Sequence, residues 1–227
     1  MDDRAGRAQR FLELHRSEAP LLLPNPWDVG SAVLLASLGF KALATTSSGF
    51  AATLGRLDGS VTRDEAISHA ATIVASTALP VSADLENGFA DDPEEVAETV
   101  RMAVEVGLAG CSIEDTIARL RCYQEAGADV LYAPGLTDLA QIRELVASVE
   151  RPVNVLALPS APTVGELVGA GVSRVSVGGA FAFAALGAVV EAARELQERG
   201  TYTFWEHARP GSRSAKAAFT NAASSNP

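Results

Sequence analysis

Short apolar runs alternate with amphipathic stretches along most of the chain. In the stretches between the runs, apolar residues recur at i, i+3 and i+4, as in Val96, Val100, Ala103 and Val104, which is the helical period. Several of these stretches end in a glycine just before the next apolar run, at Gly39, Gly107, Gly127 and Gly171. Glycine directly after a helix usually forms its left-handed C-cap. The pattern therefore predicts alternating helices and strands. The predicted strands lie near residues 21–25, 41–46, 80–84, 109–114, 129–134, 152–158 and 173–178.

The character of the strands narrows the fold class. Most are continuously apolar, which suits a parallel sheet covered on both faces, and regular βα alternation predicts a (β/α) barrel or a doubly wound sheet. No Gly-x-Gly-x-x-Gly follows the first strand, so a dinucleotide-binding fold has little support. The 227 residues suit one large domain. The pattern predicts one strand fewer than the eight that close a barrel.

Two of the predicted strands end abruptly in acids. Asp84 and Glu86 follow one strand, and Glu114 and Asp115 follow the next. Burying a charge is costly unless it is paired or bound to a metal, and the carboxyl ends of successive strands meet on one face of an α/β protein. We therefore predict a Mg²⁺ site there. Asp84 and Glu86 could instead cap the next helix, and Asp115 could simply face solvent.

Composition excludes several classes of partner. The formal net charge of −10 argues against a nucleic-acid or anionic-membrane surface, and no apolar run is long enough to span a bilayer. The two cysteines, Cys111 and Cys122, have neither metal-site nor disulfide spacing, and we expect both to be inert. We predict a cytoplasmic protein. The three histidines, His15, His69 and His207, are expected at the surface.

Several blocks of the sequence, in this order, resemble the phosphoenolpyruvate mutase/isocitrate lyase superfamily, in particular its short bacterial members. The blocks are residues 23–28 (LPNPWD), 44–49 (ATTSSG), 54–58 (LGRLD), 83–88 (ADLENG), 112–115 (SIED), 133–136 (APGL) and 174–178 (RVSVG). The resemblance covers the chain to about residue 203 and implies a (β/α)8 TIM-type barrel over residues 1–203. Residues 204–227, rich in Ser and Ala, are expected to form a loosely ordered tail.

The chain departs from the family pattern after Asp115. It continues directly into residues 116–123, which resemble the helix before the family's sixth strand. Two parts of the family pattern have no visible counterpart in this chain. One is the gating loop, which carries a catalytic Cys in the lyases. The other is the fifth strand, which carries a substrate-binding Arg. About one βα unit is missing, on the order of 30 residues. Either the sequence omits this segment or the protein lacks it. We favour omission, because a genuine gap would leave two exposed strand edges.

The resemblance also implies metal ligands. The residue matching Asp84 holds Mg²⁺, and those matching Glu86 and Glu114 hold it largely through water; Mn²⁺ is an alternative cation. This arrangement suits Mg²⁺, which keeps several waters and takes few carboxylates.

The remaining site residues follow from the same resemblance. Thr46, Ser47 and Ser48 are expected to bind a substrate carboxylate, and Asp58 to lie close to the reacting group, so that Asp58 and Thr46 are the catalytic candidates. Trp27 and Asp28 are further candidates for substrate binding. Each has a structural alternative: Asp28 is a good N-cap, Asp58 precedes Gly59 in a possible turn, and the Thr-Ser-Ser run could be an ordinary loop.

The function implied is a Mg²⁺-dependent lyase. Such an enzyme cleaves or forms a C–C bond next to a small anionic 2-oxo or 2-hydroxy carboxylate through a metal-bound enolate, and a C–C lyase or an oxaloacetate-type decarboxylase is our first expectation. A phosphonomutase that makes a P–C bond is the second. A metal-dependent aldolase and a non-catalytic metabolite-binding barrel that lost its lid remain open alternatives.

The C-terminal part suggests an oligomer. Residues 180–191 are apolar almost all round, and such a helix must be buried. In relatives the final helices contact a neighbouring subunit, so a homodimer or homotetramer is expected through Phe181, Phe183, Leu186 and Val190. A purely intramolecular core role for these residues is the alternative.

Overall fold

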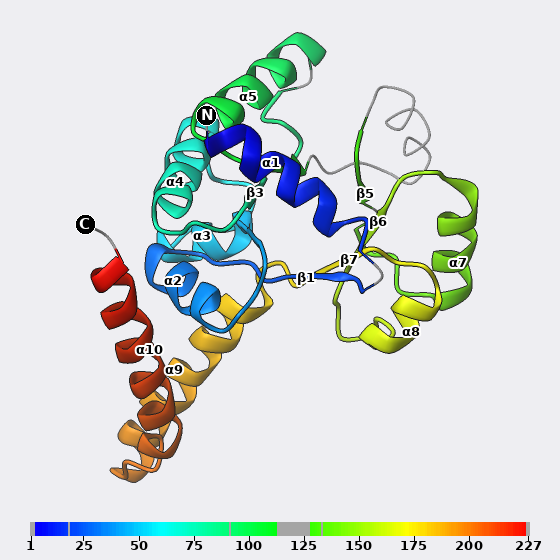
Figure 1. Ribbon diagram of the computed structural model, residues 1–227. Helices are drawn as coiled ribbons and strands as arrows, with labels where there is room; N and C mark the ends of the chain where they lie inside the picture. Colours follow the sequence, from blue (N-terminus) through cyan, green and yellow to red (C-terminus); the bar gives the residue numbers. More distant parts are fainter. Residues whose placement is uncertain (1–2, 18, 91, 113–127, 133, 226–227) are drawn as a thin grey trace.

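The computed structural model describes residues 3–17, 19–90, 92–112, 128–132 and 134–225 (Figure 1). All seven predicted strands are present in these residues, each shorter than its apolar run. They are β1 Leu21–Leu23, β2 Leu43–Ala44, β3 Val81–Asp84, β4 Gly110–Ser112, β5 Leu131–Tyr132, β6 Val153–Leu156 and β7 Arg174–Ser176.

Helices separate the strands, as the periodicity predicted. They are α1 Asp3–Leu14, α2 Val29–Ser37, α3 Ser47–Thr53, α4 Arg63–Ala75, α5 Pro93–Glu105, α7 Leu139–Ser148, α8 Val164–Gly169, α9 Ala180–Arg199 and α10 Trp205–Ser225. Local chemistry determines where they begin. Thr62 and Glu65 form a reciprocal capping box at the start of α4, and Pro93 follows the N-cap of α5. Both starts were predicted from the sequence.

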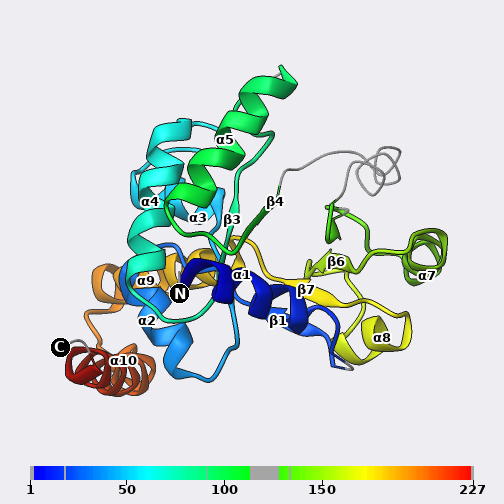
Figure 2. The same cartoon turned by 45° about the horizontal axis from the view of Figure 1, so that its top comes forward.

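Every strand pairing is parallel, and the order is that of a barrel. One sheet runs β1-β7-β6-β5 and the other β2-β3-β4. The two sheets join where Ala44 N donates to Pro24 O at 3.1 Å, directly after β1. Figures 1 and 2 show the strands around a common centre, with α1 crossing one end. The predicted interruption, between β4 and β5, falls on residues 113–127 and so lies outside the described residues.

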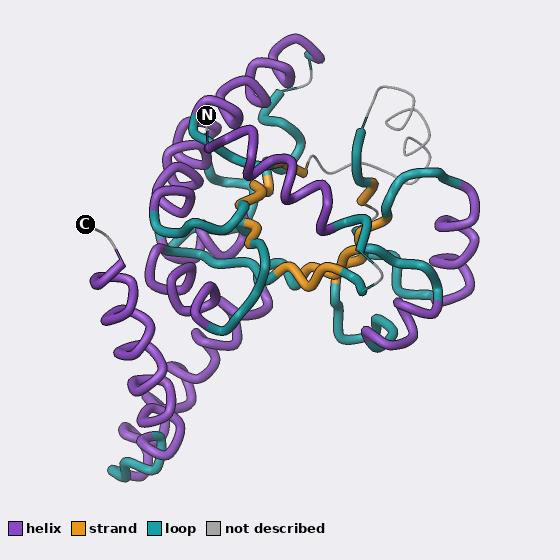
Figure 3. The backbone as a smooth tube through the Cα atoms, viewed as in Figure 1, coloured by secondary structure: helices purple, strands orange, loops and turns teal. Residues whose placement is uncertain are grey.

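The core lies mainly between the strands and the helices that surround them; Figure 3 shows this arrangement of strands and helices. Val81 and Ala83 of β3 pack outward against α2, α4 and α5, and Val153 and Val155 of β6 pack outward against α7 and α8. A smaller cluster gathers around Phe11 of α1 and closes one end of the barrel. The alternate strand positions face inward, and these carry polar side chains at the end where the site forms.

A histidine just after the first helix is also buried. His15 is only 3% exposed, its Nδ1 lies 2.7 Å from Phe11 O, and its ring packs edge-on against the Phe11 ring. The expectation that it lies at the surface was wrong. His15 lies just after the helix end, where the chain turns inward toward β1, so helical periodicity gave no sign of its burial.

Residues 205–225 also differ from the expectation, because they are ordered. This stretch forms α10, which packs along α2 (Figure 1), and the predicted loosely ordered tail was therefore wrong. Alanine has the highest helix propensity, and Ala218 is buried at 3% exposed. Small residues let α10 approach α2 closely, and the Phe219 ring of α10 lies beside Gly30 of α2, where an added Cβ would be 3.7 Å from it. No helix in the described part of the chain is long and apolar enough to cross a membrane.

Candidate active site

Asp84 is the last residue of β3, and its side chain connects two of the sequence blocks that resemble the superfamily, residues 83–88 and 44–49. Its Oδ2 accepts hydrogen bonds from Ser47 N at 3.1 Å and from Ser47 Oγ at 3.0 Å. Its Oδ1 accepts one from Glu86 N at 3.2 Å. The adjacent parallel strands β2 and β3 end side by side, which brings the start of α3 against this carboxylate. Asp84 and Ser47, 37 positions apart in the sequence, are therefore in direct contact.

The run from Thr46 to Gly49 is packed tightly at the start of α3. Thr46 is the N-cap and is 2% exposed; its Oγ1 accepts from Gly49 N at 3.3 Å and lies 3.2 Å from Ser48 Oγ. A Cβ added at Gly49 would lie 2.5 Å from Thr46 Cγ2 and 3.1 Å from Trp27 Cβ. Only glycine fits there, so the hydroxyls of this run are held in fixed positions rather than on a loose loop.

Two buried polar residues that sequence reasoning did not select support this arrangement. Thr45 Oγ1 accepts from Asp84 N at 3.1 Å. Asn25 Nδ2 donates to Thr45 O at 2.9 Å, and Asn25 Oδ1 accepts from Val177 N and Gly178 N, each at 3.0 Å. Asn25 therefore ties together the ends of β1, β2 and β7. Its position between Pro24 and Pro26 at a strand end was the available signal.

The loop after β3 adopts an uncommon backbone conformation. Glu86 has φ +49° and Phe89 has φ +60°, values that non-glycine residues rarely take. Asn87 Oδ1 accepts from Phe89 N at 3.0 Å, and the fully buried Thr99 donates to Gly88 O at 2.8 Å. These bonds hold Glu86 and Phe89 at the wall of a cavity. Backbone strain of this kind tends to cluster at functional sites.

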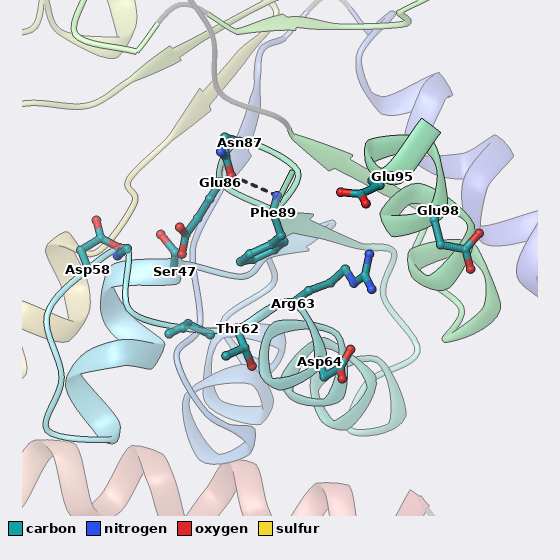
Figure 4. Close-up of a pocket in the computed structure, with 12 residues that line it drawn as sticks. Ser47, Asp58, Thr62, Arg63, Asp64, Glu86, Asn87, Phe89, Glu95 and Glu98 are labelled. Atoms are coloured by element: carbon teal, nitrogen blue, oxygen red, sulfur yellow. Dashed lines mark hydrogen bonds between the residues drawn. The ribbon is translucent and has the colours of Figure 1, made fainter. Parts of the chain in front are cut away.

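The cavity has a volume of about 1200 Å³ and is open to solvent (Figure 4). Ser47 lies at one end of it, and acidic side chains dominate its wall. The carboxylates that line it belong to Asp58, Asp64, Glu86, Glu95 and Glu98, and the basic side chain is that of Arg63. An anionic substrate entering this cavity therefore needs added positive charge.

The remaining predicted residues fall into three groups. Asp58 lines the cavity and also accepts from Gly59 N at 3.2 Å, so it is both a turn residue and a wall residue. Asp28 is the N-cap of α2, and its Oδ1 accepts a hydrogen bond from Ser31 N at 2.7 Å. Neither Asp28 nor Trp27 is among the described residues that line the cavity. Glu114, with Asp115 and Cys122, lies outside the described residues.

The other cysteine, Cys111, lies on β4 and packs against the core cluster around β3. Burial raises the pKa of its thiol. A thiol with a raised pKa is a poor nucleophile at neutral pH. The described geometry agrees with the expectation of an inert core cysteine.

Two of the described carboxylates could hold a metal ion. No group of three or more His, Cys, Asp or Glu side chains suited to a metal ion occurs among the residues that the structure describes. Asp84 and Glu86 nevertheless lie two residues apart beside the Ser47 hydroxyl, and hard oxygen donors of this kind are what Mg²⁺ prefers. Because Mg²⁺ retains several waters and needs only one or two carboxylates, this donor set fits it.

Comparison with known proteins identifies the family. The model of the phosphoenolpyruvate phosphomutase family matches residues 11–118 and 115–197, which is most of the chain. The chain belongs to the phosphoenolpyruvate mutase/isocitrate lyase superfamily. Its two matched stretches meet at residues 115–118, the point at which the superfamily pattern was expected to be interrupted. Members of this superfamily are lyases or mutases that act on small carboxylates.

Individual superfamily members agree with this assignment. A Burkholderia cenocepacia J2315 protein provisionally classed as a lyase/mutase has a crystal structure that matches at TM-score 0.91 and 41% identity, covering 96% of this chain and 98% of that one. An uncharacterised Mycobacterium tuberculosis protein is 31% identical over 234 residues, 83% of this chain and 89% of its own. The 2-methylisocitrate lyase of Halalkalibacterium halodurans is 34% identical over 116 residues, 51% of this chain and 38% of its own. The predicted (β/α)8-type fold is thereby confirmed.

Proposed function

We propose that this chain is a Mg²⁺-dependent enzyme that cleaves or forms a C–C bond next to the carboxylate of a small 2-oxo or 2-hydroxy acid. The observation that carries the proposal is the contact between Asp84 and Ser47 at the wall of the acid-lined cavity. This contact brings a carboxylate that could hold a cation next to the hydroxyl-rich start of α3.

Each side chain has a task in this proposal. Asp84 and Glu86 would hold the cation, which when bound supplies positive charge next to the oxygen where negative charge develops. The fixed hydroxyls of Thr46 and Ser48 would orient the substrate carboxylate, and Ser47, whose N–H and hydroxyl both donate to Asp84, would hold the Asp84 carboxylate in position beside them. Asp58 would accept the proton of the hydroxyl group whose carbon becomes a carbonyl as the neighbouring C–C bond breaks.

Cleavage of a C–C bond, including decarboxylation of an oxaloacetate-type acid, is the first candidate reaction. It is supported by the similarity to a 2-methylisocitrate lyase over half of this chain. Formation of a P–C bond is the second candidate, favoured by the match to the phosphomutase family model. A non-catalytic barrel that only binds a metabolite is the competing class.

A panel of substrates separates these candidates. The protein is incubated with 2-oxo acids, 2-hydroxy acids, phosphoenolpyruvate, and pyruvate together with an aldehyde, each with Mg²⁺ and with a chelator, and products are followed by NMR. We expect Mg²⁺-dependent turnover of a 2-oxo or 2-hydroxy acid. Turnover of phosphoenolpyruvate alone would assign the mutase, turnover only of pyruvate with an aldehyde would assign the aldolase, and no turnover anywhere would favour the non-catalytic barrel.

We also propose that the protein is a homodimer or a homotetramer, assembled through α9. This helix leads away from the barrel in Figure 1, and its residues Phe183, Leu186 and Val190 are each about half exposed (51%, 47% and 47%). Their spacing of three and four places them along one face. A continuous exposed apolar stripe of this kind is typical of a surface covered by another chain.

The expected result of Leu186→Glu together with Val190→Glu is a monomer in light scattering, whereas the unchanged protein is dimeric or larger. Two buried carboxylates without partners are too costly for an interface to tolerate. Arg199→Glu is the matched control, because it lies about 180° around the helix from Val190 and should leave the mass unchanged. A monomeric unchanged protein would refute the assembly.

A further inference from the structure

Arg63 is the basic side chain on the wall of an acid-lined cavity, and its charge is not neutralised within the described structure. The neighbouring arginines are paired: Arg56 Nη1 lies 2.9 Å from Glu65 Oε1, and Arg101 contacts Glu98. Within the described part of the chain, no carboxylate forms an ion pair or hydrogen bond with Arg63. Figure 4 shows its side chain extending from the start of α4 toward the space between Phe89 and Glu98.

The position of Arg63 on its helix is not explained by helix stability. Arg63 is the first residue of α4, where the helix dipole disfavours a cation and favours acids. The acids that suit this position, Asp64 and Glu65, follow it directly, and Thr62 with Glu65 already caps the helix. Removing the guanidinium should therefore cost no stability.

The cavity has two ends of different character. Ser47, Asp58 and Glu86 lie at one end, and Arg63 with Glu95 and Glu98 lies at the other, with Phe89 between them (Figure 4). A substrate whose carboxylate is held at the Ser47 end extends past Phe89 along a wall that repels negative charge. A second anionic group is stable there only where a cation faces it, and the planar guanidinium fork matches a carboxylate.

We propose that Arg63 binds a second carboxylate of the substrate, which makes the substrate a dicarboxylate rather than a simple 2-oxo monocarboxylate. The inference rests on the proposed function, since it assumes that the other carboxylate is held near Asp84. Arg63, on α4, would then determine substrate specificity from the side of the cavity opposite Asp58.

The experiment compares two probes that share one head group. N-Oxalylglycine carries an oxalyl head and a distal carboxylate, and N-ethyloxamate carries the same head and a neutral tail. Calorimetric titration with Mg²⁺ gives the ratio of their Kd values for the unchanged protein, Arg63→Gln, Arg63→Lys and Arg10→Gln. Arg10→Gln is the matched control, since it removes the same charge from an exposed site on α1 that is not among the described residues lining the cavity. Thermal melts of each variant accompany the titrations.

We expect Arg63→Gln to reduce the preference for N-oxalylglycine by at least about tenfold, with N-ethyloxamate binding and the melting temperature unchanged. Arg63→Lys should retain part of the preference, and Arg10→Gln all of it. If Arg63→Gln keeps the full preference while both probes bind, the inference about Arg63 is wrong and the proposed function stands. If neither probe binds the unchanged protein with Mg²⁺, the proposed function is wrong and the inference falls with it.

Discussion

Replacing Asp84 with asparagine is expected to lower Mg²⁺-dependent turnover by at least about a hundredfold. The carboxylate accepts from Ser47 N, Ser47 Oγ and Glu86 N, using both of its oxygens. Asparagine keeps one acceptor oxygen and introduces an NH₂ group, which must face donors wherever the amide is turned. The substitution therefore removes the negative charge that would hold the cation and also disturbs the contact with Ser47. Initial rates on the most active acid of the substrate panel provide the measurement.

Asp138→Asn is the matched control for this variant. Asp138 is the exposed N-cap of α7, where its Oδ1 accepts from Gln141 N at 2.9 Å, and asparagine caps helices as well as aspartate does. Circular dichroism and thermal melts establish that both variants are folded. A folded Asp84→Asn protein that keeps turnover within about tenfold of the unchanged protein would remove Asp84 from the metal site.

Stability is expected to fall steeply between pH 6.5 and pH 4 because of His15. Burial, with a further contribution from the Arg174 charge, lowers the pKa of His15 from 6.5 to about 4 in the folded protein; the Phe11 carbonyl and Asp129 oppose the shift. The unfolded chain therefore binds a proton more readily than the folded one in this range, so stability is complete above pH 6.5 and is lost as the pH falls toward 4. The loss attributable to His15 is roughly 3 kcal/mol.

Urea unfolding at several pH values measures this effect as a difference. Carboxylates also titrate in this range, so the free energy of unfolding of the unchanged protein is compared with that of His15→Gln. The variant should lose less stability on going from pH 7 to pH 4.5. His207→Gln, at an exposed position on α10, is the control and should follow the unchanged protein. Parallel curves for all three proteins would show that His15 is not buried in the neutral form.

Much of the fold was predictable because it depends on local chemistry. Strands such as Leu21–Leu23 are continuous apolar runs, and the capping box of Thr62 and Glu65 is visible in the sequence and present in the structure. The contact between Ser47 and Asp84 was also within reach, since the ends of adjacent parallel strands meet on one face. The remaining site residues were predicted only from the resemblance to the superfamily, and the family model confirms that the chain belongs to it.

The remaining features depend on packing that the sequence pattern does not express. Thr45 and Asn25 support the site because they form hydrogen bonds to the backbone at neighbouring strand ends. Phe89 takes its left-handed conformation from the bonds of Asn87 and Thr99 across two elements. Arg63 looks from the sequence like an ordinary exposed helix start, and only the arrangement of α4 and α5 turns it toward the cavity. The α10 helix was missed because small residues with a single Phe219 beside Gly30, rather than a continuous large apolar stripe, pack it against α2.

Calorimetric titration of oxalate, with Mg²⁺ and with a chelator, shows whether Asp84 belongs to a metal-dependent enolate site. Oxalate mimics the planar enolate of pyruvate and needs only the Asp84 end of the cavity. We expect tight binding with Mg²⁺, little or none in the chelator, and loss of the Mg²⁺-dependent part in Asp84→Asn. Equal binding in both conditions, or no binding in either, would contradict a metal-dependent enolate site.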